Sequence, residues 1–367
     1  MIAWASPLAQ YRAHEDAIRA ALTRVLESGV YVLGSEVETF ERSFAEYCRA
    51  TDAVGVGSGT DALILALRAL GIGPGDEIIT VSHTAVATVA AVLATGATPV
   101  LVDVDPTYYT LDPSGIEAVL TPRSKAVIAV HLYGQAADMD AINTVARRHG
   151  LAVLEDCAQA AGGRYRERRI GNVGDIACFS FYPTKNLGAI GDGGMVVTSD
   201  ANLAERVRRL RQYGWDEART SREPGLNSRL DPLQAAILHV KLPKLDADNA
   251  RRAAIAERYH RGLVGLPLTL PARRKDTSHA YHLYVVSCLE RDGLMAHLAE
   301  QKIGSAVHYP IPVHCQGGYA ERVIVPKSGL PVTTQLADRI LTLPIYPELG
   351  DDDVDRVIAS VRGYYPG

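Results

Sequence analysis

The most constraining feature of this sequence is a pair of short apolar runs that each lead into polar residues. The runs cover Ala152–Leu154 and Ile176–Phe181, and their lengths and flanks predict two buried strands. Asp156 follows the first run, while Ser180 and Lys185 stand at and just after the end of the second. Ligands bind at the carboxyl ends of strands in a parallel sheet. We therefore expect a carboxylate, a hydroxyl and an amine to meet in one crevice.

These three groups match what pyridoxal phosphate (PLP) requires of a protein. The cofactor needs an amine for a Schiff base, a carboxylate facing its pyridinium nitrogen and donors for its phosphate. Lys185, Asp156 and Ser180 offer one of each, and four glycines in the range 188–194 allow the backbone to approach a flat ligand closely. Taken singly, the acid is also typical of a helix cap and the lysine of a solvated surface. The combination favours PLP.

A second glycine-rich turn upstream predicts a phosphate site. The sequence indicates a strand at Ala53–Val56, a turn at Gly57–Thr60 and a helix at Asp61–Leu70, with Thr60 near the helix N-cap. Free N–H groups and the helix dipole favour an anion at such a helix start. A simple connecting turn is the alternative. Because no Walker lysine follows, the turn suits a single phosphate monoester and not a nucleotide P-loop.

The order of the predicted elements indicates the fold class. Strands alternate with helices of roughly ten residues, which is typical of an α/β protein with a mostly parallel, doubly wound sheet. The further strands expected are Glu77–Val81, Thr98–Val104, Lys125–Val130 and Ala152–Asp156, and the further helices are 82–96, Asp138–His149 and Glu205–Tyr213.

The two ends of the chain do not show this alternation of strands and helices. Helical spacing at His14–Ser28 and Glu36–Cys48 predicts a helical lead-in that packs on the main domain. Beyond a change of composition near residue 265, a smaller α+β domain is expected. We predict a large domain at residues 1–245, including the lead-in, and a small domain at 246–367. The small domain's predicted elements are strands at Tyr281–Cys288 and 305–312 and helices at Leu294–Lys302 and Asp351–Arg362.

Composition excludes several classes of protein. A net charge of -4 argues against nucleic-acid binding, and no polybasic patch or membrane-length apolar run occurs. Five cysteines without CxxC spacing favour buried free thiols, and with no signal peptide they indicate the cytoplasm. Neither HExxH nor a clustered ligand set occurs, so no metal site is expected.

Several motifs together resemble the DegT/DnrJ/EryC1/StrS family. They are GSGTDAL, EDCAQAAGGRY, FSFYPTKNLGAIGDGGMVVT, GLNSRLDPLQAAIL and HYPIPVH, in this order and over nearly the whole chain. Members of that family are PLP enzymes of fold type I, the aspartate aminotransferase-like fold, and most are nucleotide-sugar aminotransferases. The resemblance implies the same fold and cofactor here.

The resemblance assigns roles around the cofactor ring. Lys185 in PTKN would form the Schiff base and transfer protons, Asp156 would pair with the pyridine nitrogen, and Gln159 would lie near the 3-hydroxyl. Family members with histidine at the lysine position are dehydratases, so the lysine of this chain implies transamination.

The resemblance also assigns the phosphate site. Gly59, Thr60 and Ser180 would bind the phosphate, and Asn227 in GLNSRLD would reach the phosphate of a neighbouring subunit. This implies a homodimer with shared active sites. An ordinary turn residue is the alternative for Asn227.

The chain departs from the family where an aromatic residue usually stacks on the PLP ring. In VSHTAVAT this place is Ala85, so either His83 or an apolar face would cover the ring. For His83 the alternative is a neighbour of a helix cap.

The motif HYPIPVH suggests a substrate-binding segment. His308, Tyr309 and His314 would face the sugar nucleotide, while a strand end followed by a turn is the alternative.

The resemblance implies a PLP-dependent aminotransferase that moves an amino group from L-glutamate to a dTDP-linked keto-sugar. VSHTAVATVAAV, VHLYGQAADMDAI and VHYPIPVH look closest to enzymes that aminate C3. The alternatives are a C4-aminating or aminocyclitol enzyme of the same family, or a regulatory protein that binds PLP or a sugar nucleotide without turnover.

Overall fold

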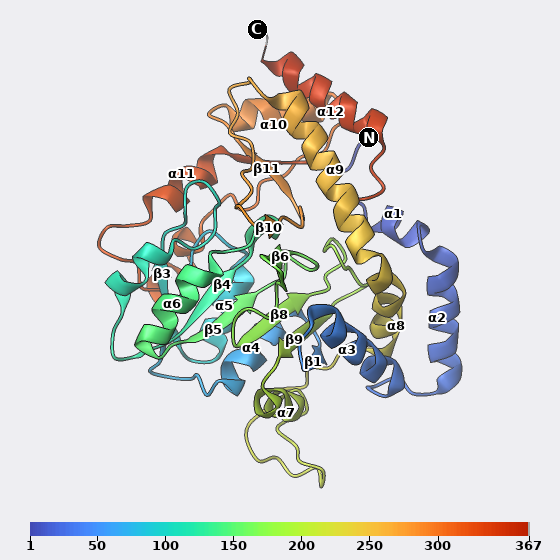
Figure 1. Cartoon of the computed structure of the whole chain (residues 1–367), viewed down its shortest axis with the longest axis vertical. Helices are drawn as coiled ribbons and strands as arrows, with labels where there is room; N and C mark the ends of the chain where they lie inside the picture. Colours follow the sequence, from blue (N-terminus) through green and yellow to red (C-terminus); the bar gives the residue numbers. More distant parts are fainter. Residues whose placement is uncertain (366–367) are drawn as a thin grey trace.

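A seven-stranded sheet forms the centre of the structure, a computed structural model that describes residues 1–365 (Figure 1). The strands lie side by side in the order β1-β9-β8-β5-β4-β2-β3. Their bounds are β1 Asp52–Val56, β2 Glu77–Val81, β3 Thr98–Val102, β4 Ser124–Val130, β5 Ala152–Asp156, β8 Ile176–Ser180 and β9 Gly194–Thr198.

The sheet is parallel except for one strand. β2 pairs in parallel with β3 and β4, and β4, β5 and β8 continue this direction. β9 runs antiparallel to both of its neighbours, β8 and β1. The mostly parallel α/β fold predicted from the sequence is confirmed, whereas the strand β9 was not among the predicted elements.

Helices cover both faces of this sheet. In α3 the buried positions Phe40 and Phe44 lie four residues apart on one helix face, and the Phe44 ring packs edge-on against Phe179 and Phe181. The first residue of α4 approaches Ser180 on the opposite face. The helices of this part are α1 Pro7–Arg12, α2 Glu15–Ser28, α3 Ser35–Cys48, α4 Gly59–Ala69, α5 Val86–Ala94, α6 Met139–His149, α7 Ala201–Leu210 and α8 Pro232–Lys241.

The C-terminal part forms a second apolar cluster. A two-stranded antiparallel sheet packs there with three helices, which Figure 1 shows together at one end of the molecule. Ile2 also belongs to this cluster, while a few C-terminal residues such as Val285 belong to the main core. The division at residues 245/246 stays a prediction. The elements of this part are α9 Leu245–Leu263, β11 Tyr284–Ser287, α10 Arg291–Glu300, α11 Pro331–Arg339, β12 Ile340–Leu343 and α12 Asp351–Tyr364. A small three-stranded sheet joins the two parts. Its strands are β10 Thr277–Ser278, β6 Arg164–Tyr165 and β7 Arg168–Arg169.

Three predicted elements differ most from the structure. The strand predicted at 305–312 is wrong, because only Ala306 makes a bridge there, to Thr342. The helix predicted at 82–96 begins only at Val86, which leaves the preceding residues as a turn. The helix predicted at 205–213 lies earlier, because Asp200 caps the N-terminus of α7.

Two further findings concern the whole described chain. Among residues 1–365, no helix has the length and apolar character that crossing a membrane requires. All five cysteines are free, and only Cys315 is exposed.

Candidate active site

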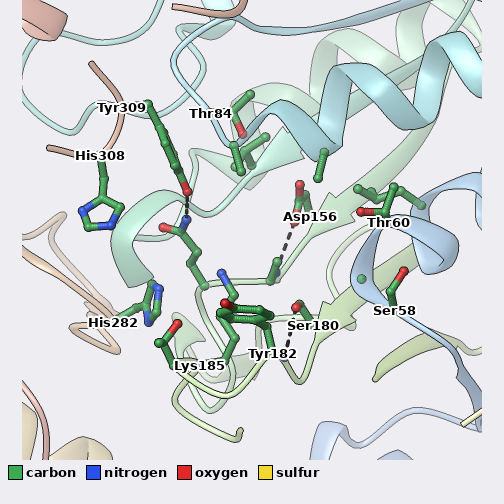
Figure 2. A pocket seen from close by; sticks show the side chains of 18 of the residues that line it. Ser58, Thr60, Thr84, Asp156, Ser180, Tyr182, Lys185, His282, His308 and Tyr309 are labelled. Carbon is green, nitrogen blue, oxygen red and sulfur yellow. Dashed lines mark hydrogen bonds between the residues drawn. The ribbon is translucent and has the colours of Figure 1, made fainter. Parts of the chain in front are cut away.

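A cavity of about 390 Å³ lies at the carboxyl ends of β5 and β8. Asp156, Ser180 and Lys185 all line it, together with the turn that starts α4. Figure 2 shows Asp156 and Lys185 between two groups of side chains: the hydroxyls of Ser58, Thr60 and Ser180 on one side and two histidines on the other. The structure thus brings the carboxylate, the hydroxyl and the amine into one site.

The loop after β8 holds the Lys185 amine in this cavity. The backbone N–H of Lys185 donates to the carbonyl of Tyr182 at 2.8 Å. Gly188 lies so close to Pro183 that a Cβ added to the glycine would be 2.5 Å from the Pro183 carbonyl oxygen. Burial lowers the pKa of Lys185 to about 8, although the negative charge of Asp156 opposes this shift. The amine therefore loses its proton more easily than a lysine in solvent.

Asp156 ends β5 with its carboxylate held by two donors. The Thr88 hydroxyl of α5 donates to Oδ2 at 2.8 Å, and the Ala158 N–H donates to Oδ1 at 3.1 Å. These bonds fix the orientation of a buried acid that faces the same cavity as Lys185.

The turn before α4 forms the third side of the site. Ser58, and not Thr60, is the N-cap: its Oγ accepts a hydrogen bond from the Asp61 N–H at 3.1 Å. Thr60 lies in the first helical turn and lines the cavity. A Cβ on Gly59 would stand 2.6 Å from the Cβ of Ser180, so only glycine permits this approach.

Gln159 connects the cavity to the C-terminal segment. Its Oε1 accepts a hydrogen bond from the backbone N–H of Tyr133 at 2.7 Å. Its Nε2 donates to the Tyr309 hydroxyl at 2.9 Å, the bond that Figure 2 draws to Tyr309. His308 also lines the cavity, and burial lowers its pKa to about 4, with the charge of Lys185 contributing.

His83 is not among the residues that line the cavity. Its ring is buried, and its Nε2 lies 2.9 Å from the Tyr133 hydroxyl. The turn that replaces the first part of the predicted helix instead presents Thr84 and Ala85 to the cavity. The interpretation that His83 covers the cofactor is therefore not supported, whereas an apolar cover remains compatible with this wall.

Two other candidate residues also lie outside the lining. His314 bonds to the Ser82 hydroxyl through Nδ1 at 2.7 Å. Asn227 is exposed. Its neighbour Ser228 accepts from the Gly57 N–H at 2.9 Å and donates to Asp61, which places Asn227 beside the α4 turn of its own chain.

The structure adds cavity residues that the sequence analysis did not identify. Trp4, Tyr182, Asp192 and His282 all line the cavity. His282 had a detectable signal, because it is the one histidine in the apolar run YHLYVV that was predicted as part of a strand. Trp4 had none, since the N-terminal residues reach the cavity only through the tertiary fold.

A buried polar cluster lies behind β5. The ligand atoms of His131, Glu155 and Cys157 lie within 4.8 Å of one another. The Glu155 carboxylate accepts N–H bonds from Gly171, Val173 and Gly174 and bonds to His131 at 3.0 Å. Although burial raises the pKa of Glu155, these bonds hold it below its usual value. The cluster fastens the 171–174 loop to the sheet.

The donor set of the cavity fits PLP. The Gly59 approach, which a Cβ would fill, combines with the Thr60 and Ser180 hydroxyls and the start of α4 to suit a phosphate monoester. The Lys185 amine and the fixed carboxylate of Asp156 lie beside this end of the cavity, and PLP needs both groups.

Comparison with known proteins gives concordant matches over nearly the whole chain. The model of the DegT/DnrJ/EryC1/StrS aminotransferase family matches residues 12–362. The chain is 51% identical over 354 residues to the dTDP-3-amino-3,4,6-trideoxy-alpha-D-glucose transaminase of Streptomyces venezuelae, covering 96% of this chain and 92% of the relative.

Solved structures agree with these sequence matches. The crystal structure of S. venezuelae DesV in complex with a ketimine intermediate superposes with a TM-score of 0.97 at 49% identity, covering 100% of this chain and 99% of that one. The structure of NtdA from Bacillus subtilis with bound cofactor PMP superposes with a TM-score of 0.88 at 31% identity, covering 96% and 82%.

Proposed function

The chain belongs to the DegT/DnrJ/EryC1/StrS aminotransferase family, and on that premise we propose that it aminates C3 of a dTDP-linked keto-sugar. The relative that is 51% identical is named for a product aminated at this carbon. The observation that carries the proposal is the buried Lys185 amine, which shares one cavity with Asp156 and the Gly59 turn.

PLP is the cofactor of this family, and the donor set of the cavity fits it. When bound, PLP takes up an amino group at its aldehyde carbon and stabilises negative charge on the carbon that loses a proton. We assign its phosphate to Gly59, Thr60 and Ser180 and its ring nitrogen to Asp156. Gln159 would lie beside the ring hydroxyl.

Lys185 is assigned two roles, covalent attachment of the cofactor and proton transfer. A group transfers protons best when its pKa is near the working pH, and burial lowers the pKa of Lys185 to about 8. Asp156, oriented by the Thr88 hydroxyl, supplies the negative charge that keeps a cationic ring nitrogen protonated. Trp4 and Tyr182 complete the wall of the cavity.

The amino donor in this proposal is L-glutamate, and the sugar nucleotide contacts His308 and Tyr309 of the same cavity. His314, which points to Ser82, is assigned to the outer part of the substrate site. The product named for the relative carries no hydroxyl on C4, so the hydroxyl next to the aminated carbon is the one on C2.

We further propose a homodimer with shared sites, working in the cytoplasm. The exposed apolar side chains of Val30, Tyr31 and Val32, each about half accessible, favour a covered surface. Asn227, exposed and outside its own cavity lining, is free to reach a second subunit. Free cysteines support a reducing compartment.

The experiment is to incubate the PLP-loaded enzyme and L-glutamate with a panel of dTDP-linked 3-keto- and 4-keto-sugars. Mass spectrometry should show an amino group on the 3-keto-sugar, and NMR of the product should place it on C3. Amination at C4, or binding of PLP and sugar nucleotide without any transfer, would select the alternative functions.

A further inference from the structure

His282 lines the active-site cavity but has no part in the mechanism above. Its side chain is 6% exposed and stands just before β11. Figure 2 shows it on the same side of the cavity as His308, away from Ser58 and Thr60. It therefore lies at the end where the sugar is proposed to bind.

Two side-chain amides, Asn249 and Asn186, determine which nitrogen of His282 carries the hydrogen. The Asn249 amide nitrogen donates to the carbonyl of Ala161 at 2.9 Å, so its Oδ1 is the atom that faces Asn186. The Asn186 amide nitrogen donates to that oxygen at 2.7 Å and to the carbonyl of Ala280 at 2.8 Å. The Oδ1 of Asn186 is therefore an acceptor, and it lies 3.2 Å from Nδ1 of His282.

An acceptor opposite Nδ1 requires the hydrogen to be on Nδ1. Burial, followed by the charges of Lys185 and Arg252, keeps the pKa of His282 well below its usual value, so the ring is neutral. In a neutral imidazole with its hydrogen on Nδ1, Nε2 carries a lone pair. No residue within 1–365 forms a hydrogen bond to Nε2, and His282 lines the cavity.

The buried amide of Gln159 makes the Tyr309 hydroxyl a hydrogen-bond donor, the role opposite to that of His282. Because the Gln159 Oε1 accepts from the Tyr133 N–H, its Nε2 must donate to the Tyr309 oxygen. The Tyr309 hydroxyl hydrogen is thus left to be donated into the cavity. The sugar end of the site presents one donor and one acceptor. Gln159 of the cavity wall fixes the donor, and Asn186, which lies outside the lining, fixes the acceptor.

We propose that His282 determines sugar specificity by accepting a hydrogen bond at Nε2 from the C2 hydroxyl of the keto-sugar. This rests on the proposed function. A keto oxygen or a carboxylate has no hydrogen to give, so among the groups next to C3 the C2 hydroxyl is the donor that complements this atom. Asn186 and Asn249 are positioning residues, because they act only through the tautomer of His282.

The test compares two substrates in two enzymes. A 2-deoxy-2-fluoro analogue keeps a weak acceptor at C2 but cannot donate. In the wild type, kcat/KM for the fluoro analogue should fall up to about 100-fold below that for the hydroxyl substrate, because Nε2 is left as an unsatisfied acceptor. In His282→Asn, whose amide nitrogen can still donate to Asn186, the two substrates should differ by less than about 3-fold.

The comparison isolates the contact because the effect of fluorine on the carbonyl is the same in both enzymes. The proposal would be overturned if the wild type and His282→Asn discriminated equally between the hydroxyl substrate and the fluoro analogue. It would also be overturned if the wild type did not discriminate between them. Calorimetric binding of the two sugar nucleotides to the PLP-loaded enzyme repeats the comparison without turnover. A complete lack of amino transfer would contradict the proposed function, while the binding comparison would still decide the role of His282.

The positioning role has its own readouts. Neutron diffraction from holoenzyme crystals should show the hydrogen on Nδ1 of His282; a hydrogen on Nε2 would overturn the proposal. Asn249→Leu should relax the discrimination between hydroxyl and fluorine, although Asn249 does not line the cavity. Asn143→Leu, which removes an amide bond to the carbonyl of Val173, is the matched control and should retain it.

Discussion

The hydroxyl of Tyr133 donates to the backbone carbonyl of His308, 175 residues further along the chain. The same oxygen lies 2.9 Å from Nε2 of His83. Since the hydroxyl has one hydrogen and the carbonyl can only accept, His83 must donate from Nε2. Burial lowers the pKa of His83 to about 4, so this histidine is a neutral donor that connects the sheet to the substrate segment.

Tyr133→Phe should therefore loosen the segment that carries His308 and Tyr309. The buried Nε2–H of His83 and the partly buried carbonyl of His308 lose their partner, which costs about 1–3 kcal/mol of unfolding free energy. KM for the sugar nucleotide should rise more than kcat falls. Thermal unfolding and steady-state kinetics measure both effects. Tyr259→Phe, which removes a buried bond to the carbonyl of Pro344, should cost similar stability but leave KM unchanged. If both variants change KM alike, Tyr133 has no special role.

Gly59→Ala should weaken PLP binding. The new Cβ would overlap Ser180, and overpacking of this kind costs about 1–3 kcal/mol. Because the strain falls on the turn assigned to the phosphate, titration of the apoenzyme with PLP should give a larger Kd. Gly73→Ala, where the nearest atom is 3.9 Å away, should bind PLP as the wild type does. An unchanged Kd in Gly59→Ala would argue against the phosphate assignment.

Lys185 should react with amine reagents at lower pH than exposed lysines. Burial lowers its pKa to about 8 because the ammonium loses hydration, so the reactive neutral amine predominates above pH 8 and declines below it. Peptide mass spectrometry of the apoenzyme labelled across a pH series should give a midpoint near 8 for Lys185. A lysine-containing model peptide labelled in the same series, with a midpoint of about 10.4, serves as the reference. Coincident midpoints would contradict the assignment, and Lys185→Ala should lose both this label and all transamination.

Asp156→Asn should retain PLP yet lose activity. The amide keeps the shape of the carboxylate but cannot hold a cationic ring nitrogen, and the loss should reach at least about 100-fold in kcat, the lower end of what a positioned acid–base group contributes. Single-turnover kinetics with L-glutamate measure this step. Asp112→Asn, which alters a surface helix cap at Ser114, should remain fully active. Comparable activity of the two variants would remove Asp156 from the mechanism.

Mixing two inactive variants should restore activity if Asn227 serves the neighbouring subunit. Lys185→Ala removes the amine, and Asn227→Asp places a negative charge against the phosphate. In a mixed dimer one site carries both lesions and the other carries neither, so random exchange should recover about one quarter of wild-type activity. Subunit exchange is verified by native mass spectrometry. Should exchange occur without recovery, Asn227 acts within its own chain and the shared-site proposal fails.

The sequence by itself determined the elements that local patterns encode. The strands Glu77–Val81 and Ala152–Asp156 have the predicted bounds, because continuous apolar runs with polar flanks favour buried strands regardless of what pairs with them. The same apolar runs are followed by polar residues. Because the carboxyl ends of parallel strands meet at one edge of the sheet, these runs predicted that Asp156, Ser180 and Lys185 share one site.

Only the tertiary structure decided the hydrogen bonds between distant segments. His83 lies outside the cavity wall, where Thr84 and Ala85 stand in its place. The ring of His282 is oriented through Asn186 and Asn249. Both positions depend on where distant segments pack. The position of β9, antiparallel between β1 and β8, was likewise decided by the tertiary structure. Local sequence fixes which face of a strand or helix is apolar, but a buried polar group takes whichever partner the fold brings within reach, and that partner is 50 residues away for His83 and 96 for His282.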